Sequence, residues 1–266
     1  MATIDGRAIA RGNEVSVLRA LHRFGWLRTR DVASLVWSRW ASRPKEGWPD
    51  FARPACSESG IRMAQRTLKR MREHGLVLSG KGPDGAVLYA LAERGARILR
   101  DGGIEAATGK DLIRSFSAAH YHHRCVANSC AIAGIQSGFR VSTEREVSQG
   151  RWVGGLTGAR GKQPDVLLRD GARHWWIEVE RSRKNARDYD HLLTWLMLAI
   201  PEVVREGSGG MLGASRVLSG VYFICRRNFA NKLTADLISR GSRKEDIEFA
   251  IRFETCLYNL EAIAFC

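Results

Sequence analysis

A strand–turn–strand pattern near the middle of the chain constrains the fold more than any other feature. The stretch QPDVLLRDGARHWWIEVE, residues 163–180, places the dipeptide Asp-Gly between two apolar runs. Asp-Gly in such a setting is a strong signal for a two-residue hairpin turn. Taking this dipeptide, residues 170–171, as the loop puts Asp165 opposite Trp176. The pattern therefore predicts a β-hairpin with a defined register.

The same register sorts the side chains of the hairpin onto two faces, because successive side chains alternate across a strand. One face is wholly apolar and carries Val166, Leu168, Trp175, Ile177 and Val179. The other face, which we expect to point outward, carries Trp176 and three acids, Asp165, Glu178 and Glu180. In this register Asp165 and Glu178 are diagonal neighbours, roughly 7–8 Å apart at the backbone.

Carboxylates gathered this closely repel one another, and a shared hard cation would remove that cost. We therefore predict a metal site formed by the three acids of the hairpin. The alternative is a solvated strand face beside the basic residues RSRK at 181–184.

Basic residues are concentrated in the N-terminal part of the chain. The net charge is +14, and the first 100 residues carry 19 Lys and Arg against 9 Asp and Glu. The other 166 residues carry 23 against 19. A basic segment joined to a more balanced body predicts a polyanionic partner, most simply nucleic acid. A general solubility charge is the alternative.

The N-terminal third shows the element order of a winged helix-turn-helix domain. Helical spacing predicts two helices within residues 14–37 and a third over 60–74, followed by two strands and a further helix. Ser57 or Ser59 is a candidate cap for the third helix. A helix fits the major groove, where Arg and Gln reach base edges and Lys meets phosphates. The predicted DNA-binding residues are Arg62, Gln65, Arg66 and Lys69 on this helix and Lys81 at the wing. The alternative is a surface helix with solvated charges and a dimerising wing.

A glycine-rich segment, residues 100–111, marks a predicted boundary between a winged-helix domain at 1–105 and a second domain at 106–266. The second domain alternates helical and strand patterns, so we expect a mixed α/β domain and an α+β fold overall. Its expected elements are a helix at 112–137, a strand at 139–147, the hairpin, a helix around 192–200, a strand at 217–226, a helix at 229–240 and a strand region at 247–260. The loop at 41–57 is long for a connection, and its role is left open.

The hairpin acids resemble a known nuclease motif. Pro164-Asp165, twelve further residues and then Glu178-Val179-Glu180 resemble the PD-(D/E)XK motif of restriction-endonuclease-like nucleases. The surrounding order of helix, strand, hairpin, helix and strand adds to the resemblance. The chain departs from the motif at its third position, where Glu180 stands in place of the usual Lys.

The chain as a whole is similar to plasmid replication-relaxation proteins and the MOBC class of conjugative relaxases. The resemblance rests on the winged helix followed by YHHRCVAN, PDVLL and IEVERSRK, and it spans roughly residues 13–200. It implies that the three acids bind Mg²⁺ or Mn²⁺ and activate water, and that Lys184 steadies the phosphate or the water. His123 and Asn128 match a supporting His-x4-Asn feature.

The resemblance implies a metal-dependent DNA endonuclease, a relaxase, that nicks double-stranded plasmid DNA at a transfer origin to start conjugative mobilisation. Other transfer or coupling proteins would be further partners, and oligomerisation is left open. One alternative is a non-catalytic DNA-binding accessory or replication-control protein on a nuclease-like scaffold. Another is a defence nuclease that cuts both strands. A covalent role for Tyr121 or Tyr189, and a zinc site among the His and Cys residues of 120–130, are further alternatives.

The sequence also indicates the compartment. It contains no apolar run near 18 residues, and its N-terminus lacks the apolar region of a secretory signal. None of the six cysteines forms a C-x-x-C pair. We therefore expect reduced thiols, a cytoplasmic location and no membrane insertion.

Overall fold

The structure, a computed structural model, describes residues 5–114, 117–181, 185–205, 210–255, 258–259 and 264–265. It has the predicted α+β composition. The chain forms two compact units, one made of Met1–Trp40 and Pro54–His122 and the other of Ala41–Arg53 and His123–Cys266. This division lies further along the chain than the predicted boundary at 105/106, and it assigns residues 41–53 to the second unit.

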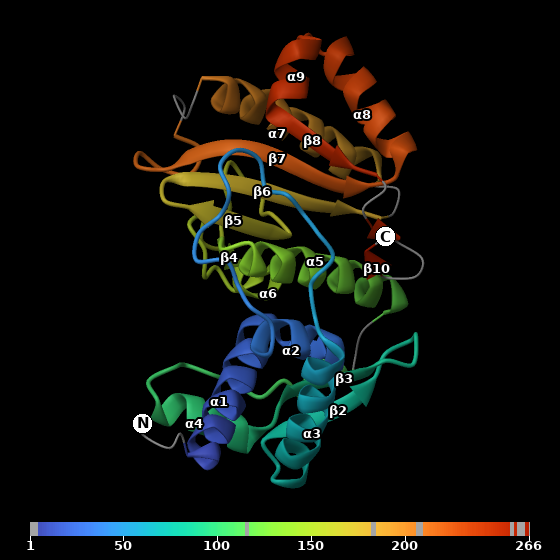
Figure 1. Cartoon of the computed structure of the whole chain (residues 1–266). Helices are drawn as coiled ribbons and strands as arrows, with labels where there is room; N and C mark the ends of the chain where they lie inside the picture. The colour runs from blue at the N-terminus through green and yellow to red at the C-terminus, as the bar shows by residue number, and fades with distance from the viewer. Residues whose placement is uncertain are drawn as a thin grey trace. The chain divides into compact units, whose positions relative to one another are not determined.

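The first unit combines helices with a small antiparallel sheet (Figure 1). Its elements are α1 (Gly6–Phe24), β1 (Trp26–Arg28), α2 (Thr29–Val36), α3 (Glu58–Glu73), β2 (Val77–Lys81), β3 (Val87–Leu91), α4 (Glu93–Asp101) and the short 3₁₀ helix η1 (Asp111–Ile113). The sheet has the strand order β1-β3-β2.

Local sequence explains the placement of α3. The Ser57 hydroxyl accepts a hydrogen bond from the Gly60 amide at 3.0 Å, so Ser57, one of the two predicted candidates, is the cap. Ala64, Leu68 and Met71 recur at helical spacing and are fully buried. The opposite side of α3 is consequently left for charged side chains.

The second unit is built on a mixed five-stranded sheet with the order β4-β5-β6-β7-β8. Its strands β4, β5 and β6 are antiparallel, whereas β6, β7 and β8 are parallel. The elements are α5 (Ala118–Gln136), β4 (Arg140–Ser142), α6 (Glu144–Ser148), β5 (Val166–Asp170), β6 (Arg173–Glu180), α7 (Ala186–Val204), β7 (Val217–Cys225), α8 (Arg227–Ser239), α9 (Lys244–Ala250) and β8 (Ile251–Glu254). Two short strands, β9 (Tyr258–Asn259) and β10 (Ala264–Phe265), pair separately.

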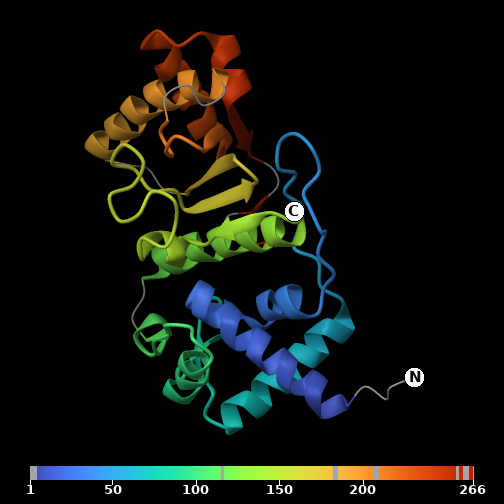
Figure 2. The same ribbon diagram turned by 90° about the vertical axis from the view of Figure 1, so that its left-hand side faces the viewer.

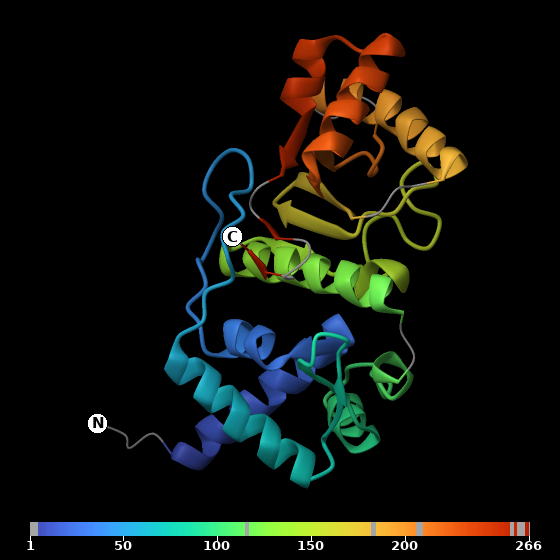
Figure 3. The same cartoon turned by 90° about the vertical axis from the view of Figure 1, so that its right-hand side faces the viewer.

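Helices cover both faces of this sheet (Figures 2 and 3). On one face α7, α8 and α9 bury a single apolar cluster that includes Trp176, Trp195 and Phe223. On the other face α5 lies so close that a Cβ added at Gly134 would be 2.6 Å from the Leu168 side chain. The central strands are therefore buried on both sides.

Residues 41–53 extend the cover of the α5 face. The Trp48 ring lies against Gly220 and makes an edge contact with Tyr222, with ring centroids 5.5 Å apart. Phe51 contacts the same tyrosine ring at 4.9 Å. The long predicted loop thus has a packing role on β7.

Two predicted strands were partly wrong. Residues 139–147 form β4 and then α6, because Thr143 and Glu146 make a capping box that starts a helix. The predicted strand region at 247–260 begins as the end of α9, and β8 starts only at Ile251.

None of the helices in the described part of the chain has the length and apolar character needed to cross a membrane.

Candidate functional site

The hairpin forms where predicted, but its turn is one residue later. Asp170 pairs with Arg173, so the loop is Gly171-Ala172 and not Asp170-Gly171. Gly171 takes the left-handed conformation, with φ of 59°. Asp170 stays in the strand, and its carboxylate accepts a hydrogen bond from Arg173 at 2.7 Å. Each β5 residue consequently meets a partner two residues beyond the predicted one.

The shift of two residues preserves the two faces of the paired strands. The pairing begins at Val166, opposite Ile177, and Asp165 lies just before it, with its amide donating to the Ile177 carbonyl at 3.0 Å. Asp165 therefore departs from the regular register, and its side chain contacts His123 of α5, whereas Glu178 lies beside Phe223 on the face covered by α7.

The prediction that the acids point outward was wrong for Glu178 and Glu180. Glu178 and Glu180 are only 4% and 6% exposed, because the strand pairing puts them on the face covered by α7. Their cross-strand partners on β7, Phe223 and Cys225, belong to the apolar cluster on that face. Buried carboxylates require compensating partners.

Asp165 uses both carboxylate oxygens in hydrogen bonds. Its Oδ1 accepts from His123 Nε2 at 3.0 Å, and its Oδ2 accepts from the Val179 amide at 2.7 Å. Burial raises the pKa of Asp165, but the charge and hydrogen bond of His123 and the Val179 amide outweigh it and hold the pKa below its ordinary 3.8. Asp165 is thus ionised at neutral pH.

His123 is the counter-charge of Asp165. Burial lowers its pKa, but the charge and hydrogen bond of Asp165, with Glu144 and Glu178 further away, raise the pKa to about 9. The ring is therefore protonated at neutral pH and donates to Asp165. The predicted supporting residue does contact the predicted acid.

Glu178 is compensated by a residue that the sequence analysis missed. Its Oε1 accepts from Lys162 Nζ at 2.8 Å and from Trp176 Nε1 at 2.5 Å. The Lys162 ammonium also lies 6.0 Å from the Trp176 ring centroid and 5.9 Å from that of Trp195. The only sequence signal was its position in the glycine-rich loop directly before Pro164-Asp165.

The remaining predicted site residues lie in different settings. Glu180 ends β6 beside Cys225, and burial together with the Glu180 charge raises the pKa of that thiol to about 12. Asn128 lies on α5 and is buried. Lys184 lies outside the described residues.

The hairpin acids are the candidate ligands for a divalent ion. Within the described residues, no group of three or more His, Cys, Asp and Glu is arranged to hold a metal. Mg²⁺, however, is usually bound by one or two carboxylates together with water and substrate phosphate. Asp165, just before β5, and Glu178 on β6 supply two carboxylates of that kind, each in contact with a cationic side chain.

Neither tyrosine shows the features of an activated nucleophile. The Tyr121 hydroxyl donates to Asp84 at 2.6 Å, and its ring stacks on Trp26 in the first unit. The Tyr189 hydroxyl donates to Asp236 at 2.7 Å, and burial together with that carboxylate raises its pKa. A higher pKa disfavours the phenolate form that attack requires.

Cys130 does not support the alternative of a zinc site. Its side chain is fully buried, and burial raises the pKa of the thiol. Zinc is bound by the thiolate.

The predicted DNA-binding side chains share one property, which is exposure to solvent. These residues are Arg62, Gln65, Arg66 and Lys69 on α3 and Lys81 at the end of β2. On α3 they alternate with the buried stripe, and Arg62 pairs with Glu58 at 3.2 Å. The first unit therefore presents a basic helix face to solvent.

The His123–Asp165 pair predicts a stability that depends on pH. Because the folded pKa of His123 is raised to about 9, its contribution is fully present below the ordinary value of 6.5 and is lost as pH rises through 9. We expect His123→Gln to lower the free energy of unfolding by about 2 kcal/mol at pH 6. At pH 10 the variant and the natural protein should be equally stable.

Urea unfolding at the two pH values measures this difference. His191→Gln, which changes an exposed histidine of the same unit, is the control and should cost the same at both pH values. A His123→Gln cost that did not change between pH 6 and pH 10 would contradict the assigned ion pair.

Comparisons of the chain with family models, with curated proteins and with solved structures find no match.

Proposed function

We propose that the chain is a divalent-metal-dependent DNA endonuclease that nicks plasmid DNA at a transfer origin. The observation that carries the proposal is that two carboxylates of the predicted motif, Asp165 just before β5 and Glu178 on β6, each contact a cationic side chain, His123 and Lys162. One or two carboxylates, completed by water and substrate phosphate, are the usual donor set for Mg²⁺.

The architecture supports a nuclease-like reading of the second unit. The order α5, β4, β5–β6 hairpin, α7 and β7 is the order that the PD-(D/E)XK resemblance implies. In the first unit, three helices followed by the β2–β3 strands match the order of a winged helix-turn-helix. The basic face of α3 would contact the duplex, and Lys81 would contact the backbone.

The residues of the hairpin suggest a division of roles. Asp165, Glu178 and Glu180 would hold Mg²⁺ or Mn²⁺. The ion would supply a nucleophilic hydroxide and neutralise charge on the phosphate. His123 orients the Asp165 carboxylate through Oδ1, and the Val179 amide fixes Oδ2.

Lys162 supplies the ammonium group that is missing at the third motif position. That position holds Glu180 in place of the usual Lys, but an ammonium group still lies 2.8 Å from Glu178. A cation there can balance the buried acid before DNA binds and can meet a phosphate oxygen afterwards. Lys162 is therefore a better supported partner of the acids than Lys184.

A second candidate function is a non-catalytic DNA-binding accessory or replication-control protein. The observation that favours it is that both oxygens of Asp165 and Oε1 of Glu178 already have protein partners. Acids whose hydrogen bonds are made within the protein in this way can have a purely structural role.

A cleavage assay separates the two functions. Supercoiled plasmids that carry transfer-origin fragments are incubated with the protein and Mg²⁺ or Mn²⁺, with EDTA as the control. We expect open-circular DNA in the presence of metal only. A linear product would indicate a nuclease that cuts both strands, and binding without any cleavage would support the accessory role.

A further inference from the structure

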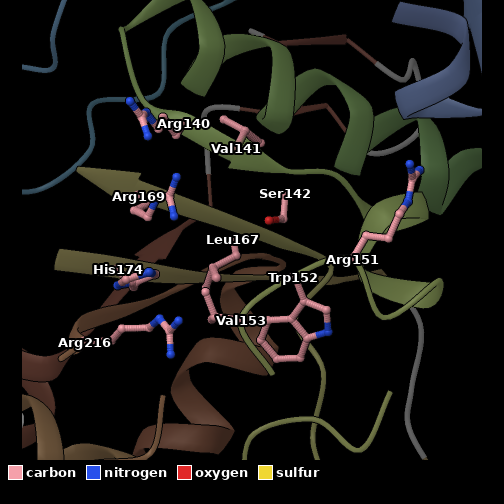
Figure 4. Close-up of a pocket in the computed structure, with 10 residues that line it drawn as sticks. All are labelled: Arg140, Val141, Ser142, Arg151, Trp152, Val153, Leu167, Arg169, His174 and Arg216. Atoms are coloured by element: carbon pink, nitrogen blue, oxygen red, sulfur yellow. The ribbon is translucent and has the colours of Figure 1, made fainter. Parts of the chain in front are cut away.

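A second group of polar residues lies on the same sheet face as Glu178, nearer the hairpin turn. It lines a pocket of about 370 Å³ with four arginines, Arg140, Arg151, Arg169 and Arg216, together with His174 and Trp152. Among the described residues that line this pocket, none is acidic. We refer to this feature as the arginine pocket (Figure 4).

Strand pairing places three of these side chains in a row. Arg140 on β4 pairs with Arg169 on β5, which pairs with His174 on β6. Figure 4 shows Arg140, Arg169, His174 and Arg216 along one side of the pocket. Like charges directly opposite each other across a sheet are destabilising. An anion bound between Arg140 and Arg169 would be attracted to both side chains and would offset their repulsion.

His174 provides an independent sign of a missing ligand. The residue is 1% exposed, and its Nδ1–H donates to the Ala172 carbonyl at 2.7 Å. Its Nε2 is buried and makes no hydrogen bond of ordinary geometry within the described part of the chain, although the Val217 backbone is a polar neighbour of the ring. An unpartnered buried ring nitrogen is costly. Burial, followed by the charges of Arg169 and Arg216, lowers the pKa of His174, so the ring is neutral until an anion offsets those charges.

The pocket is shaped before any ligand binds. Arg216 donates through Nη1 to the Leu212 carbonyl at 3.0 Å, which fixes its guanidinium. Trp152 donates to the Gly155 carbonyl at 2.7 Å, and its ring meets that of Trp176 at 5.8 Å between centroids. Guanidinium groups recognise phosphate through paired hydrogen bonds, and an indole offers a stacking surface for a base.

The arginine pocket and the acid pair lie along the same hairpin. Arg169 is four residues from Asp165 on the chain, roughly 13 Å along an extended strand, which is the span of a few nucleotides. Between them lies Trp176, which contacts Trp152 on one side and hydrogen-bonds Glu178 on the other. The pocket therefore lies on the same hairpin as the acids.

We propose that the arginine pocket binds a nucleotide of single-stranded DNA. Arg140, Arg169 and Arg216 hold its phosphate, and Trp152 stacks on its base. The pocket is too small for a duplex, so it takes a strand that has separated from its complement. The inference rests on the proposed DNA-directed function. It adds to that function a site that holds the DNA strand next to the cleaved position.

The test measures binding of a fluorescent single-stranded oligonucleotide by anisotropy, in EDTA so that cleavage plays no part. The variant is Arg140→Gln with Arg169→Gln, two side chains that have no ion pair within the described residues. The matched control is Arg173→Gln with Arg243→Gln, which removes the same charge from exposed arginines paired with Asp170 and Asp246. Circular dichroism verifies that both proteins are folded.

We expect the pocket variant to bind the oligonucleotide at least about tenfold more weakly and to lose about 1.4 from the slope of log affinity against log salt. The control should change affinity less than about twofold. Equal losses in the two variants, or no loss in either, would overturn the proposal. So would a loss confined to adenosine monophosphate in a parallel titration, because the pocket would then serve a free nucleotide. Because no metal is present, a negative result here leaves the nicking assay unaffected.

Discussion

Asp165→Asn is expected to abolish metal-dependent nicking, with a loss of at least about 1,000-fold in rate. The substitution keeps the shape of the side chain and an oxygen for the Val179 amide, but it removes the negative charge. A divalent ion that stabilises the reacting phosphate supplies several kcal/mol, and each 1.36 kcal/mol corresponds to a tenfold change in rate. Initial rates of open-circle formation in Mg²⁺ measure the loss.

Asp170→Asn is the matched control for this substitution. Asp170 ends β5 of the same hairpin, and its partner is Arg173 at the turn. We expect its nicking rate to remain within about twofold of the natural protein. Both variants should retain duplex binding, because the α3 surface belongs to the other unit. Undiminished nicking by Asp165→Asn, or an equal loss in Asp170→Asn, would contradict the assignment of Asp165.

The hairpin illustrates what sequence alone could predict. Alternation and the Asp-Gly signal were enough for the two strands and for the side chains on each face. The exact turn was not predictable, because Asp170-Gly171 and Gly171-Ala172 both satisfy a two-residue loop. The ion pair between Asp170 and Arg173 and the left-handed Gly171 favour the second. Both registers keep the faces, since they differ by an even number of residues.

Burial of the acid face could not be predicted from the hairpin itself. Leu167 and Trp176 also lie on that face, but the element that covers it is α7, which follows β6 in the chain. Lys162 was missed for a related reason. It lies in a loop with no periodic pattern, and only the tertiary fold brings it to Glu178.

The same reasoning applies to the arginine pocket. Its residues come from three strands, the loop after α6 and the segment before β7, so no stretch of sequence contains them as a motif. Strand pairing is what aligns Arg140, Arg169 and His174. Sites assembled across a sheet depend on register, which is the property that the sequence specified least well here.

Lys162→Met is expected to lower the free energy of unfolding of the protein by about 3 kcal/mol. The Lys162 and Glu178 side chains are 14% and 5% exposed, so the substitution leaves a buried carboxylate without its counter-charge. Removing one partner of a buried ion pair is far more costly than removing a surface pair. Urea unfolding at pH 7, followed by tryptophan fluorescence, measures the change.

Two further variants serve as controls for this measurement. Lys232→Met is the matched control, because Lys232 also pairs with an acid, Asp236, and lies over the Tyr189 ring, but its side chain is 61% exposed. Its cost should stay below about 1 kcal/mol. Adding Glu178→Gln to Lys162→Met should recover about 2 kcal/mol, because the amide keeps the bond from Trp176 without a buried charge. If Glu178→Gln instead lowered the free energy of unfolding further, Glu178 would be stabilised by something other than Lys162. That result would contradict the Lys162–Glu178 ion pair.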